Sequence, residues 1–212
     1  MFRGGPPEGL DHLIYLAQDL DAACSDLERR TGVRPVRGGT HPQYGTHNAL
    51  LGLGPRMYLE VLSPDPAAAS FPGRELFGFE RPPLPRLATW CAAVADLDEH
   101  VARAEAKGAN LGLVEAGGRR RPDGSEVHWR ITPPLMQAGG LVPFFIQWGD
   151  AAHPATGAPA GCRLRRLEAE HPDPESVWKL LNAVGVELFV SRGPRARLVA
   201  TIDCPAGAVT LV

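Results

Sequence analysis

The spacing of apolar residues changes from a strand-like to a helix-like pattern, and this change recurs along the chain. A short run rich in strand-forming residues is followed each time by apolar residues at helical spacing, and then by further short apolar runs. Asp19, Asp96 and Asp173 stand where strand pattern gives way to helix pattern, and they are 77 residues apart in both cases. Aspartate is a favoured N-cap, and a glycine follows each one 12 or 13 residues later, where a helix would end. The pattern predicts three copies of a strand–helix–strand–strand–strand unit.

We expect the first unit at residues 8–65, the second at 85–150 and a shorter third unit at 162–212. Asp173 is followed by Pro174, which suits the first turn of a helix and marks the third helix start clearly. The segments 63–86 and 149–161 are rich in Pro, Ala and Gly, and we interpret them as linkers. The predicted fold class is therefore α+β, built from repeated β-α-β-β-β units.

Composition argues against nucleic-acid-binding and membrane-spanning proteins but does not identify a ligand. The 212 residues include 22 Lys and Arg against 24 Asp and Glu, which argues against a dedicated nucleic-acid surface. The densest cationic group is Arg119, Arg120 and Arg121, which is either solvated or a clamp for an anionic substrate. No stretch approaches the roughly 20 apolar residues that would cross a bilayer, so we expect no membrane segment.

The cysteines indicate a reducing environment. Cys24, Cys91, Cys162 and Cys204 are far apart and form no C-x-x-C pair, so we expect buried thiols rather than disulfides. The first eight residues lack the apolar core of a signal peptide. These features together predict a cytoplasmic protein.

Two strand residues are the best candidates for chemistry. Alternate side chains of a strand share a face, so His12 is expected beside Leu10 and Ile14, and Glu60 beside Tyr58 and Leu62. Polar groups among apolar neighbours are costly to bury unless they are paired or bound to a ligand. His12 and Glu60 therefore form either a site or a satisfied buried pair. The remaining histidines are expected at exposed positions or in a linker, namely His41, His100, His128, His153 and His171, with His47 left open between a loop contact and a ligand contact.

Several short motifs point to one family when they are taken together. They are Leu10-Asp11-His12, Gly45-Thr46-His47-Asn48, Tyr58-Leu59-Glu60, Arg121-Pro122-Asp123-Gly124, Trp129-Arg130, Pro143-Phe144-Phe145-Ile146-Gln147-Trp148 and His153-Pro154. With the repeated unit, this set resembles the vicinal oxygen chelate superfamily, which includes glyoxalase I, extradiol dioxygenases and bleomycin-resistance proteins, and within it the glyoxalase-like domain group. The resemblance implies that two units pair into a half-open, cupped mixed sheet with the site in its hollow.

The resemblance also implies where a metal would bind. In metal-dependent relatives the first and last strands of two units each supply one ligand to a divalent ion, here Zn, Fe, Mn or Ni. The repeat offset matches His12 to Thr89, and strand position matches Glu60 to Gln147. Threonine is a poor ligand, which favours a site without a metal, unless His47 supplies the missing imidazole. The metal candidates are thus His12, Glu60, His47 and Gln147.

Two functions from different classes remain open. The first is a lyase, isomerase or dioxygenase acting on a small oxygenated or carbonyl compound, with His12 and Glu60 as catalytic residues. The second is a metal-free protein that binds or sequesters a small molecule, as bleomycin-resistance proteins do. Either would contact its ligand through side chains around the hollow, for which the candidates are Tyr44, His47, Asn48, Trp90, Arg130, Phe145, Gln147 and Trp148.

Two further expectations concern charge and assembly. Arg130, on a strand expected to line the hollow, is the candidate partner for a carboxylate or carbonyl of the substrate. In the third unit Arg166 stands at the position of His12, and no acid matches Glu60, so this unit is expected to carry no site. It could pack on the other two units or complete a sheet with a second copy, which makes a homodimer plausible.

Overall fold

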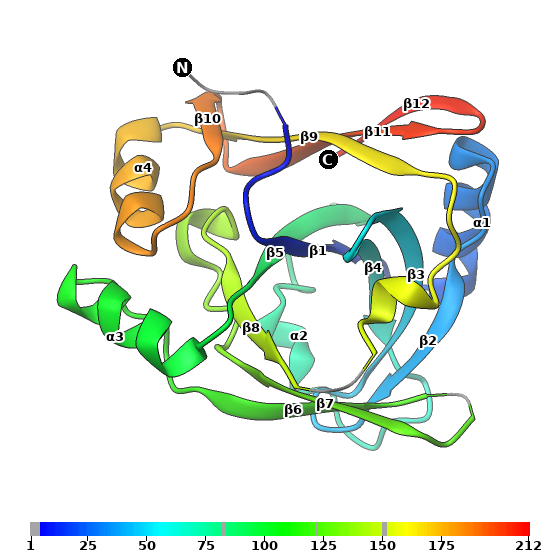
Figure 1. Ribbon diagram of the computed structural model, residues 1–212. Helices are drawn as coiled ribbons and strands as arrows, with labels where there is room; N and C mark the ends of the chain where they lie inside the picture. Colours follow the sequence, from blue (N-terminus) through cyan, green and yellow to red (C-terminus); the bar gives the residue numbers. More distant parts are fainter. Residues whose placement is uncertain (1–4, 82–83, 122, 150–151) are drawn as a thin grey trace.

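A computed structural model describes residues 5–81, 84–121, 123–149 and 152–212 (Figure 1). The first unit contains β1 (Leu10–Leu16), α1 (Leu20–Thr31), β2 (Val36–His41), β3 (Thr46–Gly54) and β4 (Met57–Pro64). The second contains β5 (Arg86–Ala93), α3 (Leu97–Ala106), β6 (Glu115–Arg120), β7 (Glu126–Ile131) and β8 (Phe144–Trp148). The third contains β9 (Arg163–His171), α4 (Pro174–Ala183), β10 (Phe189–Arg192), β11 (Arg197–Cys204) and β12 (Gly207–Leu211). The predicted α+β class and the repeated order of elements are confirmed.

The repeated aspartates start the three long helices. The Asp19 carboxylate accepts a hydrogen bond from the backbone N–H of Ala22 at 2.9 Å, and Asp96 accepts one from Glu99 at 2.9 Å. Asp173 does the same for the third helix at a longer 3.4 Å. Each bond satisfies a backbone donor that the first helical turn leaves free.

The first two units form one closed barrel with the strand order β1-β4-β3-β2-β6-β7-β8-β5. Within each unit the first strand pairs in parallel with the last, and β1 and β5 join the two units in antiparallel fashion. The other junction, between β2 and β6, is a single residue pair, Thr40 with Arg120. The sheet is therefore more closed than the half-open cup we expected, but one side is held by a narrow seam.

A bulge in β1 changes which residues face the barrel interior. Leu10 pairs with Ala92 and His12 with Cys91, so Asp11 is an extra residue that the partner strand does not match. Leu10 consequently packs in the larger core outside the barrel, whereas His12 lines the interior. The expectation that Leu10 and His12 share a face is wrong for this reason.

The third unit has the predicted order of elements but a different strand order, β10-β9-β11-β12. Here the first strand pairs in parallel with the second and antiparallel with the third, which leaves β12 at an edge. Figure 1 shows this sheet as a layer over the barrel, where β11 contacts β5, β9 contacts β3, and β12 contacts α1. Its buried residues, such as Leu167 and Ile202, share the larger core with barrel residues such as Leu13.

The two segments that we interpreted as linkers each contain a short helix and residues that pack against the barrel. Residues 82–83 and 150–151 of these segments lie outside the described part of the chain. In the first segment the helix α2 (Gly73–Leu76) is followed by Phe77 and Phe79, which pack in the smaller core inside the barrel. In the second, the short 3-10 helix η2 (Pro154–Thr156) contacts β3 and β4. A third short helix, η1 (Gln137–Gly139), precedes β8.

All four cysteines are free thiols, three of them buried, as expected. Among the described residues, no helix combines the length and apolar character needed to cross a bilayer.

Candidate active site

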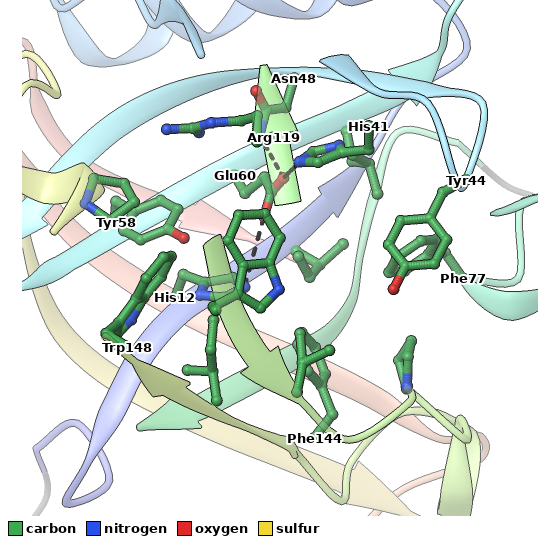
Figure 2. A pocket seen from close by; sticks show the side chains of 17 residues that line it. His12, His41, Tyr44, Asn48, Tyr58, Glu60, Phe77, Arg119, Phe144 and Trp148 are labelled. Carbon is green, nitrogen blue, oxygen red and sulfur yellow. Dashed lines mark hydrogen bonds and ion pairs between the residues drawn. The ribbon is translucent and has the colours of Figure 1, made fainter. Parts of the chain in front are cut away.

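The barrel interior contains a cavity enclosing about 570 Å³ of space, part of it open to solvent (Figure 2). Its walls are mainly aromatic and aliphatic, as is usual for sites that bind small molecules. Polar side chains are few and come mostly from the first unit: His12, His41, Asn48 and Glu60, joined by Arg119 of the second unit. The aromatic walls are formed by Tyr44, Tyr58, Phe77, Trp129, Phe144 and Trp148.

His12 and Glu60 lie next to each other in this cavity. They stand on the adjacent parallel strands β1 and β4, where Ile14 is the residue directly opposite Glu60. His12 Nε2 is 3.6 Å from Glu60 Oε2, and the two residues are only 4% and 7% exposed. Because this distance exceeds that of a hydrogen bond, neither group is fully engaged by the other.

Asp11 supports His12 from behind. Asp11 Oδ1 accepts a hydrogen bond from His12 Nδ1 at 2.7 Å. Asp11 Oδ2 accepts a second from Trp148 Nε1 at 2.8 Å and lies 2.9 Å from Nε2 of His153. Burial raises the pKa of Asp11, but the bonds to His12 and His153 outweigh it and hold the pKa well below its ordinary value. Asp11 is thus an ionised carboxylate that fixes the His12 ring with Nε2 directed toward Glu60.

The second oxygen of Glu60 is held on the opposite side. Asn48 Nδ2 donates a hydrogen bond to Glu60 Oε1 at 2.6 Å, and His41 Nε2 lies 3.8 Å from the same oxygen. Burial lowers the pKa of His41 from 6.5 to about 4; Glu60 opposes this change and Arg119 adds to it. His41 is therefore neutral at neutral pH and is a hydrogen-bonding group rather than a cation.

Of the residues we expected to contact a ligand, five lie outside the cavity. On β8 the side chains alternate, so Phe144 and Trp148 line the cavity while Phe145 packs in the larger core. Gln147, on the outer face like Phe145, accepts a hydrogen bond from the backbone of Leu97 at 3.2 Å, at the start of α3.

The other three are held by different partners. Trp90 is fully buried and donates to the carbonyl of Leu141 at 2.8 Å. Arg130 is bound to the exposed Asp98 at 2.7 Å, and His47 is bonded to Arg37 at 3.2 Å. The predicted residues that the structure does bring together in the cavity are His12, Tyr44, Asn48, Glu60 and Trp148.

Sequence reasoning missed part of the site. His41 and His153 are 6% and 3% exposed, where we expected an exposed residue and a linker residue. Asp11 and Tyr58 were also not singled out, although Tyr58 stacks on the His12 ring with centroids 4.8 Å apart. The adjacency of Asp11 and His12 was the available signal, but regular alternation would have placed them on opposite faces.

The donor set does not fit the metal arrangement that the resemblance implies. Ile14 is opposite Glu60 in the first unit, and Cys91, 77 residues after Ile14, is opposite Phe144 in the second. The equivalent of Glu60 is therefore Phe144, which cannot bind a metal, and not Gln147 as we expected. Among the described residues, no group of three or more His, Cys, Asp or Glu side chains is arranged to hold a metal ion.

Comparisons with known proteins give one family match and several structures with partial similarity. Residues 10–185 match a family described as "Glyoxalase-like domain". A hypothetical protein from Staphylococcus aureus has a similar structure, with a TM-score of 0.72, 14% identity, and coverage of 95% of this chain and 97% of that one. Methylmalonyl-CoA epimerase from Mycobacterium tuberculosis gives a TM-score of 0.45 at 21% identity, covering 70% and 93% of the two chains. A hypothetical protein from Bacillus halodurans C-125 gives 0.48 at 15% identity, covering 69% and 97%. No curated protein sequence matches.

Proposed function

This chain belongs to the glyoxalase-like domain family of the vicinal oxygen chelate superfamily, and from that premise we propose that it is an enzyme. The proposed reaction is proton transfer at the carbon next to a carbonyl group, as in an isomerase or lyase acting on a small oxygenated compound. The observation that carries the proposal is the buried series Asp11–His12–Glu60, whose last two members face one cavity 3.6 Å apart.

Glu60 is the proposed base. Asn48 holds one of its oxygens at 2.6 Å, which orients the carboxylate and leaves the other oxygen free to accept a proton from carbon. The electron pair of the broken C–H bond moves to the carbonyl oxygen, giving an enolate. His12, fixed by Asp11, directs Nε2 into the cavity, where an Nε2–H group would donate a hydrogen bond to that oxygen as its negative charge develops. Return of the proton to the same or another carbon completes an isomerisation.

The cavity supports a substrate with an apolar body. Aromatic and aliphatic side chains form most of its wall, as is usual for sites that bind small molecules. Because Thr89 and Phe144 stand where the second unit would supply ligands, the proposed step requires no metal, which favours an isomerase or lyase over a metal-dependent dioxygenase.

The alternative is a metal-free protein that binds or sequesters a small molecule. The specific observation in its favour is Phe144, which makes the second-unit side of the cavity apolar where a catalytic or ligating acid would stand. In that case Glu60 and Asn48 would only orient the ligand.

Exchange of carbon-bound hydrogen for deuterium separates the two functions. Small ketones, aldehydes, 2-oxo acids and thioesters would be incubated with the protein in D2O and followed by proton NMR. The enzyme hypothesis predicts loss of the signal next to the carbonyl for at least one compound, slowed by about 10²-fold or more in E60Q. Binding without exchange across the whole series would favour the alternative.

A further inference from the structure

Arg119 is a buried cation without a counter-ion in the described part of the chain. It lies on β6, is 6% exposed, and takes part in no ion pair or side-chain hydrogen bond among the described residues. Its Nε is one of the few buried polar atoms that lack a partner. Burying an unpaired charge is costly, so such a residue is normally kept for a partner that is not part of the protein fold.

Arg119 adjoins the proposed catalytic group. It lines the cavity, and Figure 2 shows it beside Asn48, above Glu60. The missing side chain of Gly38 makes room here, because a Cβ on Gly38 would lie 2.3 Å from Asn48 Oδ1 and 2.9 Å from Arg119 Nη1. Asn48 Oδ1 is itself buried without a hydrogen-bond partner. Two unsatisfied polar groups thus lie close together. Asn48 connects them to Glu60, because its Nδ2 donates a hydrogen bond to the Glu60 carboxylate.

A second opening reaches the same residue from outside. Arg119 also lines a groove between β2, the residues that follow β6 and the η2 segment, together with Arg37 and Arg121. Arg37 is neutralised by Asp21 at 2.7 Å, which leaves Arg119 as the buried charge where cavity and groove adjoin. A ligand can therefore place its apolar part in the barrel and its charged end at this junction.

We infer that Arg119 binds the carboxylate of a small organic monoanion whose apolar body occupies the barrel cavity. One unpaired guanidinium balances one negative charge, and its planar set of donors matches a carboxylate in two parallel hydrogen bonds. The inference deepens the proposed function, on which it rests for the identity of the site, by naming the substrate class. Arg119 thereby takes the carboxylate-binding role that we predicted for Arg130, whose guanidinium is already paired with Asp98.

The test compares each carboxylate with its neutral amide of the same shape. Acetate, isovalerate, benzoate, phenylacetate and 2-naphthoate, with the five matching primary amides, would be titrated against the full chain by calorimetry and by thermal unfolding. We expect at least one carboxylate to bind wild type at least tenfold more tightly than its amide. In R119Q the ratio should fall to about one, and R119K should keep part of it.

Matched variants separate recognition from folding and from catalysis. R130Q removes an arginine that is already paired and should leave the ratio unchanged. R119M should unfold at a temperature no lower than wild type, because it removes an unpaired buried charge. E60Q should keep the preference for carboxylates whether or not it exchanges carbon-bound hydrogen, so failure of the catalytic proposal is seen independently.

Four results would overturn the inference. Three of them are an equal affinity of carboxylates and amides for wild type, an unchanged preference in R119Q, and the absence of binding by every carboxylate in the series. Preferential binding of phenylphosphonate over benzoate would also overturn it, since the site would then accept a dianion.

Discussion

Individual residues show how far alternation along a strand predicts a site. His12 and Glu60 were found because polar groups stood among apolar neighbours on predicted strands, and Asn48 was a candidate through its motif with His47. The structure brings all three together. Asp11 was not found, because it is the residue of β1 that β5 leaves unmatched. Regular alternation along the strand would direct its side chain away from His12. His41 was misjudged, and Arg119 was left open between a solvated residue and a clamp for an anion, because their burial depends on closure of β2 against β6, which the sequence of neither strand indicates.

Removal of the Asp11 charge should be costly. D11N replaces the carboxylate with a neutral amide. The three groups that surround it, on His12, Trp148 and His153, then lose the anion to which they are hydrogen-bonded. We expect the free energy of unfolding at pH 7 to fall by about 3–5 kcal/mol, measured by urea denaturation. D98N, which breaks the exposed pair with Arg130, should change it by less than about 1 kcal/mol. Equal effects of the two variants would contradict the role given to Asp11.

His41 predicts a pH dependence of stability. Its pKa is lowered from 6.5 to about 4 in the folded protein, mainly by burial, so between these values the unfolded chain binds more protons than the folded one. Stability should therefore fall as the pH decreases through this window, by up to about 3 kcal/mol from this residue. H41Q should flatten the dependence between pH 6.5 and 4, whereas H128Q, at an exposed histidine, should not. A steep slope that persists in H41Q would exclude His41 as its cause.

At the scale of elements, the order of strands and helices was predictable but their pairing was only partly so. The capping aspartates and apolar periods define where each unit begins. In the third unit β9 pairs with β10 and β11, where the first strand of the other units pairs with the last. Local sequence does not distinguish these outcomes, because both bury the same apolar face and the choice depends on contacts between units.

The β2–β6 seam depends on a glycine. A Cβ on Gly39 would lie 2.1 Å from the carbonyl oxygen of Arg120, and its φ of +147° is rarely adopted by other residues. Gly54 has nearly the same φ, +143°, but nothing within 4 Å of the added atom. G54A should therefore lower the free energy of unfolding by about 1 kcal/mol, from backbone strain alone. G39A should cost at least about 1–2 kcal/mol more, from the added clash at the seam. Similar losses in calorimetric unfolding would show that the seam tolerates a side chain.

At the scale of the whole molecule, the third unit acts as a cover for the barrel. Its sheet shares one apolar core with the outer faces of β1 and β5, which would otherwise be exposed. The Staphylococcus aureus structure is similar over 95% of this chain, so the fold of all three units recurs at 14% identity. We propose that the three units form one cooperative domain; the homodimer stays a prediction.

Cooperativity can be tested in the third unit. Leu167 is fully buried on β9, and L167A should lower the free energy of unfolding by about 2–5 kcal/mol. If the units unfold together, tryptophan fluorescence, which reports largely on the barrel, and far-UV circular dichroism should shift to the same lower midpoint. Phe189 on β10 is 40% exposed, and F189A should have a much smaller effect. Separate midpoints for the two signals would show that the cover unfolds independently.

The parallel pairing of β1 with β4 has an evolutionary consequence. Every group proposed to move a proton belongs to one half of the duplicated barrel, whereas the other half contributes aromatic wall and the unpaired guanidinium. Under the proposed function, the acid–base groups and the carboxylate-binding arginine are thus encoded in separate stretches of the gene. Mutations in the downstream stretch that spare Trp148 and His153, which hold Asp11, can change what the protein accepts and leave the acid–base groups intact. Such a barrel therefore has a simple route to new specificities.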